Sequence, residues 1–583
     1  MSDSDRRVAV TVLAVTAVAL VARFASLGAR VAHWDEGRVG YWVLRYAETG
    51  AYTYHPIVHG PFLFHVNRVV FETLGASDLT MRAVVAVTGG LLPLTAWLLR
   101  ERLSGAETVT LAVAFAANPL LLYYSRFMRS DVLVAAFAFA AFAFFVRAYD
   151  TGLRRHLYAG ALALGLAFTT KENALVYAAC WVGALGLLLD WVLVRARVRD
   201  RSAVAVLAER GVAVGRGLRA WTRHLVGAVV GFSVVLVVFY APRPEFGHAL
   251  ANPALLPDVI ARATVGSVGK FADTWVGGHS HSYVHFFVHD LGTLAGGALV
   301  LSGLAVVGFL HDRYTGDGPR PLVAFAGYWG GASLVIYPAI SDITAPWAMI
   351  HVVVPLAVPA AVGGGLLVSG LSWPADADVR RRVRAVDAGA VVAVLLIVAL
   401  LGWSVATGVG AAFVHPQQPG PLVQYGQPNA EMTDTLAEID GAVAANANAA
   451  GPDVLYYGGH FYAASEPSAA PDESFSEPGH WTRRLPLPWY FEAMGAETAS
   501  VGHPDALNDT TAPVVVTRAR NYDVVAPKLE GYEATTYRLT ATDTPTVFFV
   551  RNDTASGAGS VDAATVRSPS GEATPARATT ASR

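Results

Sequence analysis

The chain has 583 residues, of which 54% are hydrophobic, and its mean hydropathy is +0.41. Because soluble chains average about 45–50% apolar residues and lack long uninterrupted apolar runs, these values exclude an ordinary soluble protein and predict a polytopic membrane protein. From Gln417 onward, 20 acidic residues stand against 10 basic ones, which argues against nucleic acid as a partner. Cys180 is the only cysteine, so an intrachain disulfide is excluded.

Eleven apolar runs approach the length of about 17–25 residues that crosses a bilayer. They are residues 8–26, 81–99, 107–124, 131–146, 156–169, 173–194, 224–240, 291–310, 321–340, 347–371 and 387–409. We expect the first run to be a retained helix, because no small-residue cleavage site follows it. The fold class expected for residues 1–411 is therefore mainly α, a membrane bundle of about 11 spans.

The arginine residues predict the orientation of this bundle. With Arg6 and Arg7 in the cytoplasm, strict alternation places the Arg-rich connections on the same side, including residues 195–223 with eight arginines. The other connections and the region after residue 411 then lie outside. We predict a multi-pass cell-membrane protein with a cytoplasmic N-terminus and an extracytoplasmic C-terminal domain.

The region after the last run has a different pattern. Short apolar runs at Val454, Pro513 and Val547 alternate with polar stretches, which predicts a small acidic α/β domain over residues 412–552. Residues 553–583 are rich in Ser, Thr, Ala and Gly, and we expect them to be disordered. Lysine occurs only three times in the chain, which together with the acidic domain favours a salt-loving host; a GC-rich genome would also explain the arginine usage.

The outer loop over residues 27–80 carries the densest group of side chains able to do chemistry. Asp35 and Glu36 follow the first run directly, and we predict them to be the catalytic carboxylates. A carboxylate at a membrane surface can act as a general base on a hydroxyl or can bind a hard cation. Residues 37–49 suit a short interfacial helix, whose N-terminus would favour an ionised Asp35. The alternative is a solvated helix cap.

The same loop continues into a turn that contains two histidines, His55 and His59. Imidazole can hold a metal, donate to a phosphate or move a proton. Neighbouring Pro and Gly residues favour a rigid turn over a helix, so the spacing alone does not predict a metal pair. We predict substrate or lipid-phosphate binding, with solvated loop histidines as the alternative.

A very short outer loop holds Arg126, Arg129 and Asp131. Charged residues so near a membrane are costly unless they are paired or used in function. An arginine can bind a phosphate through two parallel donors, and Asp131 can bind a metal or a sugar hydroxyl. The alternative is an Arg–Asp pair that only anchors the loop at the interface.

Two further outer connections supply candidate substrate-binding residues. Lys171 and Glu172 join two runs almost without a loop, and the compact ammonium of Lys171 suits a lipid-linked phosphate; the alternative is a simple ion pair in a hairpin turn. Asp342 lies at the outer end of a run and His351 one turn inside the next. We expect Trp347, between them, in the interfacial aromatic belt.

These motifs, in this order and on one side, resemble those of membrane glycosyltransferases with the GT-C fold. The motifs are the outer Asp-Glu pair, the His-Pro loop, Y-S-R-x-x-R-S-D and T-K-E-N-A, over roughly residues 1–410. The group includes protein O-mannosyltransferases and aminoarabinose transferases, and the motif order is most similar to the archaeal flippase-activity-associated family of N-glycosylation.

The resemblance implies an inverting transfer of a sugar from a polyprenyl (dolichyl) phosphate carrier to a lipid-linked glycan or protein acceptor, with other glycosylation proteins as partners. It implies that Asp35 is the catalytic acidic residue, Asp131 the second acidic position and Lys171 a group near the lipid phosphate. The chain departs from the pattern before Pro346, where relatives carry a Glu-Lys pair and this chain has Asp342-Ile-Thr-Ala.

Two questions remain open at the level of sequence. One is whether a divalent cation, Mg²⁺ or Mn²⁺, is held by Asp35 and Asp131. The other is whether the chain is a non-catalytic protein that binds or presents lipid-linked glycans, as the family name suggests. Transport would predict ionisable residues deep inside the runs; few occur, which favours chemistry at the outer surface.

Overall fold

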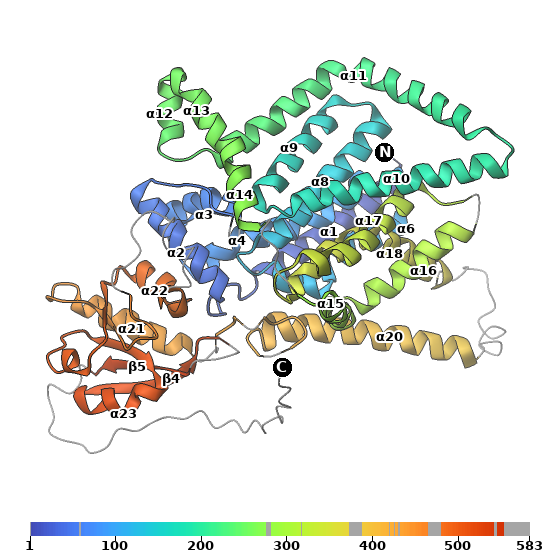
Figure 1. Cartoon of the computed structure of the whole chain (residues 1–583). Helices are drawn as coiled ribbons and strands as arrows, with labels where there is room; N and C mark the ends of the chain where they lie inside the picture. The colour runs from blue at the N-terminus through green and yellow to red at the C-terminus, as the bar shows by residue number, and fades with distance from the viewer. Residues whose placement is uncertain are drawn as a thin grey trace.

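The computed structural model describes residues 2–56, 60–275, 281–315, 318–371, 388–418, 420–424, 426–428, 432–463, 480–540 and 545–552. A bundle of helices is followed by a smaller domain that contains a β-sheet (Figure 1). The mainly α bundle with an extra α/β domain that the sequence predicts is therefore confirmed. The predicted disordered tail lies outside the described residues.

The bundle is built from helices of very different lengths. In chain order they are α1 (Asp3–Phe24), α2 (Trp34–Thr49), α3 (Pro61–Leu74), α4 (Asp78–Leu91), η1 (Leu92–Leu94), α5 (Thr95–Leu98), α6 (Gly105–Ala117), α7 (Pro119–Tyr124), α8 (Ser130–Thr151), α9 (Arg154–Thr170), α10 (Ala174–Val198), α11 (Ala203–Tyr240), α12 (Glu245–Ala251), η2 (Pro253–Leu255), α13 (Leu256–Ala261), η3 (Arg262–Gly266), α14 (Ser267–Trp275), α15 (Tyr283–Gly297), α16 (Leu299–Tyr314), α17 (Pro321–Ile340), η4 (Pro346–Met349), α18 (Ile350–Leu371), α20 (Ala388–Val409) and η5 (Gly410–Val414).

In the described part of the chain, seven helices are long and apolar enough to cross a membrane, or eight if the bent pair α15–α16 is one span. Two expected runs are broken. Asn118 ends α6 and caps α7, accepting a hydrogen bond from the Leu121 N–H at 3.2 Å, and Pro119 starts the new helix. The run over residues 291–310 bends by 98° between α15 and α16. The count of eleven spans stays a prediction.

Small residues allow the helices of the bundle to approach closely. A Cβ atom added at Gly308 of α16 would lie 2.5 Å from the backbone nitrogen of Gly363 in α18. Close backbone contact of this kind is a main source of helix association in membranes, where burial of apolar area drives little. Larger side chains such as Phe139 and Trp329 fill the interior and are fully buried.

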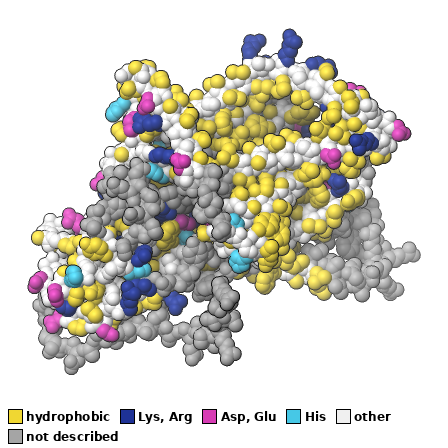
Figure 2. Space-filling model, in the orientation of Figure 1, with side chains coloured by type: hydrophobic (Ala, Val, Ile, Leu, Met, Phe, Trp, Pro, Cys, Tyr) yellow, Lys and Arg dark blue, Asp and Glu magenta, His cyan; other side chains and the backbone are white. Residues whose placement is uncertain are grey.

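Helix α11 is longer than a bilayer requires. Its 38 residues extend about 57 Å at 1.5 Å each, against a hydrocarbon core of about 30 Å. The second half packs on α9, where the Tyr240 hydroxyl donates to the Phe168 carbonyl at 2.8 Å. The first half carries Arg210, Arg216 and Arg219. Figure 2 shows hydrophobic side chains over the bundle, with basic side chains at its upper rim.

The smaller domain is a five-stranded mixed sheet with helices on both faces. Its elements are α21 (Met432–Asn446), β1 (Val454–Tyr457), η6 (His480–Arg484), α22 (Leu487–Met494), β2 (Thr498–Val501), η7 (Pro504–Leu507), β3 (Val514–Arg518), η8 (Ala519–Asn521), α23 (Tyr522–Val525), η9 (Ala526–Lys528), β4 (Tyr532–Arg538) and β5 (Pro545–Arg551). The strand order is β2-β1-β3-β5-β4. Strand β1 runs parallel to its neighbours β2 and β3, whereas β5 runs antiparallel to its neighbours β3 and β4.

The apolar runs of the sheet follow from burial on both faces. Val454 and Tyr456 pack with Ile439 of α21 on one face, whereas Leu455 packs with Val525 of α23 on the other. Successive side chains of a strand point to opposite faces, so a strand covered on both sides is apolar at every position.

Candidate active site

Asp35 lies in the first turn of α2. His33 is the N-cap residue: its Nδ1 accepts a hydrogen bond from the Asp35 N–H at 3.0 Å. Burial outweighs the nearby Asp35 carboxylate and lowers the pKa of His33 to about 4, so the imidazole is neutral and can accept this bond. Asp35 therefore lies at a helix N-terminus, a position that favours an ionised carboxylate. Asp35 is only 8% exposed.

A chain of alternating charges runs from Asp35 into the protein. Arg129 Nη1 donates to Asp35 Oδ2, and Arg129 Nε donates to Asp131 Oδ2 at 3.3 Å. Lys171 Nζ lies 2.7 Å from Asp131 Oδ1, and His351 Nε2 lies 3.4 Å from the same oxygen. We call these five residues the outer charge cluster, after the connections that the sequence predicts to be on the outer side. They come from α2, the start of α8, the α9–α10 connection and α18.

The charged groups of the cluster are largely buried, so they need partners. Burial by itself lowers the pKa of Arg129, but the carboxylates of Asp35 and Asp131 outweigh it and raise the pKa, so the guanidinium stays charged. Asp131 is 1% exposed. Charges this deeply buried persist only when they are paired.

Aromatic side chains contact the Arg129 and His351 side chains of the cluster. The Trp347 ring lies 3.6 Å under the Arg129 guanidinium carbon. The Tyr177 hydroxyl lies 2.7 Å from His351 Nδ1, and the Tyr337 ring stacks on the His351 imidazole at 4.5 Å. The prediction of Trp347 in the interfacial belt is wrong, because the η4 turn that begins at Pro346 brings the ring into the interior.

Glu36 lies next to Asp35 in sequence but has different surroundings. It is fully buried, and its carboxylate accepts four hydrogen bonds at 2.8–3.0 Å, from Arg82 Nε and Nη2 and from the backbone N–H groups of Met128 and His33. Arg30 Nη2 forms an ion pair with the same carboxylate at 2.8 Å. Burial alone would raise its pKa, but Arg30 and Arg82 hold the pKa well below its usual range. This geometry favours an organising role for Glu36 over the catalytic role predicted for it.

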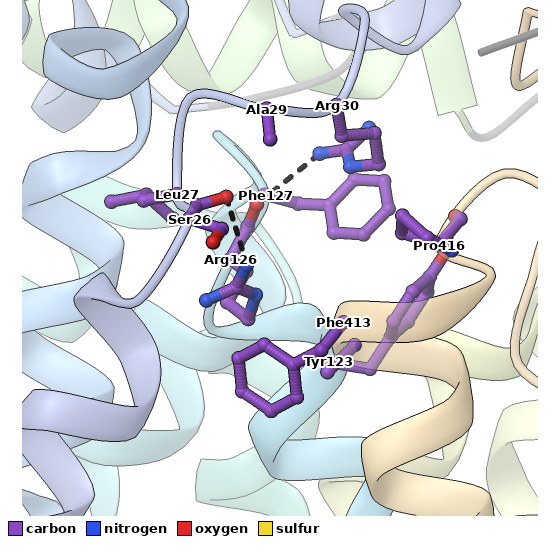
Figure 3. A pocket seen from close by; sticks show the side chains of 10 residues that line it. Ser26, Leu27, Ala29, Arg30, Tyr123, Arg126, Phe127, Phe413 and Pro416 are labelled. Atoms are coloured by element: carbon purple, nitrogen blue, oxygen red, sulfur yellow. Dashed lines mark hydrogen bonds between the residues drawn. The ribbon is translucent and has the colours of Figure 1, made fainter.

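The Arg126 guanidinium is also hydrogen-bonded within the protein. Its guanidinium donates to the carbonyl groups of Arg23 at 2.9 Å, in the last turn of α1, and of Ala25 at 2.6 Å and Ser26 at 3.1 Å, just after it. Figure 3 shows Arg126 beside a hollow, with its nitrogens turned to this backbone. The arrangement is that of a helix C-terminal cap rather than of an open phosphate clamp.

We expect the change Arg126→Gln to lower the thermal unfolding midpoint, because hydrogen bonds to a charged group contribute about 1.5–3 kcal/mol each to stability after exchange with water is counted. Affinity for a polyprenyl phosphate should change less than twofold. Thermal unfolding and lipid binding of the purified protein check this, with exposed Arg216→Gln as the control. A tenfold loss of lipid affinity at unchanged stability would support the phosphate role instead.

The remaining predicted residues lie apart from the cluster or at its edge. The Tyr54 hydroxyl donates to Glu172 at 2.5 Å, and burial raises the pKa of Glu172 despite this bond. His55 is half-buried beside Tyr54, Asp342 is exposed between α17 and η4, and His59 lies outside the described residues. The structure thus brings together Asp35, Arg129, Asp131, Lys171 and His351 from the predicted set.

The predicted metal ligands do not form a metal site as they stand. Arg129 lies between Asp35 and Asp131 and pairs with both. Among the residues that the structure describes, no group of three or more His, Cys, Asp or Glu side chains could hold a metal ion. The Arg129 guanidinium occupies the place between the two carboxylates.

Comparisons with known proteins agree with this architecture. Residues 55–208, which include Arg129, Asp131 and Lys171, match the family model described as dolichyl-phosphate-mannose-protein mannosyltransferase. Residues 432–552 match the model of the Agl23 flippase-associated protein C-terminal domain. No curated protein sequence matches the chain.

Two crystal structures of ArnT from Cupriavidus metallidurans share the fold at 18% sequence identity and a TM-score of 0.53. The apo structure covers 92% of this chain and 97% of ArnT; the structure bound to undecaprenyl phosphate covers 94% and 99%. The GT-C resemblance predicted from the motifs is therefore confirmed. The chain has the GT-C fold of ArnT, with a mannosyltransferase-type segment in its bundle and an Agl23-type C-terminal domain.

Proposed function

We propose that the protein transfers a sugar from a polyprenyl (dolichyl) phosphate carrier to an acceptor hydroxyl at its extracytoplasmic face. The observation that carries this proposal is the outer charge cluster, in which two carboxylates and two cations lie together at one end of the bundle. The similarity to ArnT, which binds undecaprenyl phosphate in one of its structures, supports a carrier of this class.

In the proposed reaction, Asp35 takes the proton of the acceptor hydroxyl. The acceptor oxygen forms a bond to C1 of the sugar as the bond from C1 to the phosphate oxygen breaks, with inversion at C1. The electron pair leaves with the polyprenyl phosphate, whose charge Arg129 and Lys171 balance. Asp131 binds both cations and is a positioning residue.

We further propose that the acceptor is a lipid-linked glycan or a protein in archaeal glycosylation, that the N-terminus is cytoplasmic, and that the host lives in high salt. The Agl23-type domain supports the pathway and partner proteins of that pathway. The Arg-rich connections support the orientation, and the excess of acidic residues after Gln417 supports the host.

A second candidate function is non-catalytic binding of a lipid-linked glycan. The match to a flippase-associated protein favours it. Purified protein in liposomes with a labelled dolichyl-phosphate sugar and a pool of lipid-linked glycans separates the two. Label in a new glycosidic bond, with release of dolichyl phosphate, supports transfer. Label that binds but stays on the carrier supports the second function.

We expect transfer to persist within about twofold in the presence of EDTA, because Arg129 pairs with both carboxylates predicted to bind a cation. The measurement is the initial transfer rate before and after chelation, and after adding back Mg²⁺ or Mn²⁺. A rate that is lost on chelation and restored by either ion would show that transfer requires a divalent cation.

A further inference from the structure

The C-terminal domain packs directly on α2, the helix that carries Asp35. Figure 1 shows α22 beside α2. The contact is closest at two glycines of α2: a Cβ atom added at Gly37 would lie 2.7 Å from Pro486 Cα, and one added at Gly40 would lie 2.6 Å from the Trp489 ring. A helical glycine costs about 0.5–1 kcal/mol relative to alanine, so two on this face indicate a packing requirement.

Buried polar groups hold the same contact. Trp489 Nε1 donates to Asp78 Oδ1 at 3.0 Å, and the Tyr490 hydroxyl donates to Asp78 Oδ2 at 2.8 Å. The same hydroxyl accepts the Ala32 N–H at 2.6 Å, just before α2 begins. Asp78 is the first residue of α4, one turn before Arg82. The domain therefore contacts both the start of α2 and α4, the helix whose Arg82 binds Glu36 of α2.

The segment that leads into the domain holds the start of α2 from another side. Gln427 Oε1 accepts a bond from Arg30 Nη1 at 2.6 Å, and its Nε2 donates to the Val31 carbonyl at 2.9 Å. The Trp34 N–H donates to the Gly426 carbonyl at 3.1 Å. The first turn of α2 thus has partners from the linker as well as from α22.

The far end of α2 is fixed as well. Arg45 Nη1 lies 3.1 Å from Glu492 Oε1 of α22. With Gly37, Gly40 and the start of the helix, the contact extends along most of α2. A helix held along its length has little freedom to tilt or slide.

We propose that the C-terminal domain is a positioning domain that sets the place of Asp35 opposite Arg129. Trp489 and Tyr490 act through α2 and Asp78, so they are positioning residues without substrate contact. The catalytic consequence rests on the proposed transfer function, because misplacement of a reacting group by about 1 Å can cost about 10²-fold in rate.

The test compares Gly37→Ala/Gly40→Ala and Trp489→Phe/Tyr490→Phe with wild type in the full-length protein. In a helix with open space, Gly→Ala stabilises; here the methyl groups clash with the domain. The control is Gly211→Ala/Gly215→Ala in α11, where an added Cβ meets nothing within 4 Å. The Phe pair removes the donors to Asp78, keeps the ring of residue 490, and leaves a smaller aromatic ring at residue 489.

Two readouts are measured: amide hydrogen exchange of α2, and kcat and KM for the labelled dolichyl-phosphate sugar. We expect both test pairs to speed α2 exchange tenfold or more, with exchange in the sheet strands unchanged. Transfer should lose tenfold or more in kcat with KM within twofold, and the control pair should match wild type. Unchanged α2 exchange in both pairs would overturn the proposal. Amide exchange of α2 can be measured even if the protein does not transfer sugar. The positioning proposal is therefore tested whether or not the proposed transfer function is correct.

Discussion

Replacing Asp35 with asparagine is expected to lower the rate of sugar transfer by about 10²–10⁴-fold, the range that a general base contributes. Asparagine keeps the size of the side chain and an acceptor for Arg129 but cannot take a proton. Carrier binding should remain within a few-fold of wild type, because Arg129 and Lys171 keep their pairs with Asp131. Labelled transfer and carrier binding are measured on the same membranes.

The matched control is Asp258→Asn, which removes a carboxylate that is 74% exposed on α13 and should leave transfer unchanged. A D35N variant with the wild-type rate would remove Asp35 from the role of base. Loss of carrier binding in that variant, in proportion to the loss of rate, would instead assign Asp35 to ground-state binding of the sugar.

Replacing Glu36 with glutamine is expected to destabilise the protein by about 3–5 kcal/mol, the usual cost of leaving buried charges without their partner. Arg82 is fully buried, and Glu36 is the carboxylate on its Nε and Nη2. Thermal or denaturant unfolding in detergent measures the loss. Glu209→Gln, at a site 62% exposed and paired with Arg201, is the control and should change stability by less than about 1 kcal/mol.

The pH dependence of stability gives a second test of Glu36. The pKa of this carboxyl is lowered in the folded protein, so its contribution is present above the unfolded pKa of about 4.3 and is lost as the pH falls further. Wild type should therefore lose more stability than E36Q between pH 5 and pH 3. Parallel stability curves for the two proteins would show that Glu36 is not ionised in the fold.

Much of the cluster could be predicted from the sequence, because very short connections on one side of the bundle confine their charged side chains to the same region. Arg129, Asp131 and Lys171 all lie in such loops and meet. The roles of Asp35 and Glu36 could not be separated, since adjacent acidic residues have the same chemistry in a sequence. On a helix they lie about 100° apart, which directs one to Arg129 and the other to α4.

Other features were not predicted from the sequence, for similar reasons. Arg82, inside the second apolar run, was a visible signal, because a charge within a span needs a partner, but its partner Glu36 could not be identified from spacing. Tyr177 is an ordinary aromatic residue in an apolar run, and nothing in its neighbourhood marks it as the partner of His351. The broken run at Asn118-Pro119 had a readable cap signal that the hydropathy count ignores.

The order of residues in the outer charge cluster has a consequence for biosynthesis. A ribosome that adds about 5–20 residues per second delivers Arg129 within about 20 s of Asp35, but His351 only after roughly 15–60 s. Trp489, which anchors the second domain on α2, is made later still. The cluster and its support by the C-terminal domain are therefore complete only after synthesis has passed both α18, which carries His351, and α22, which carries Trp489.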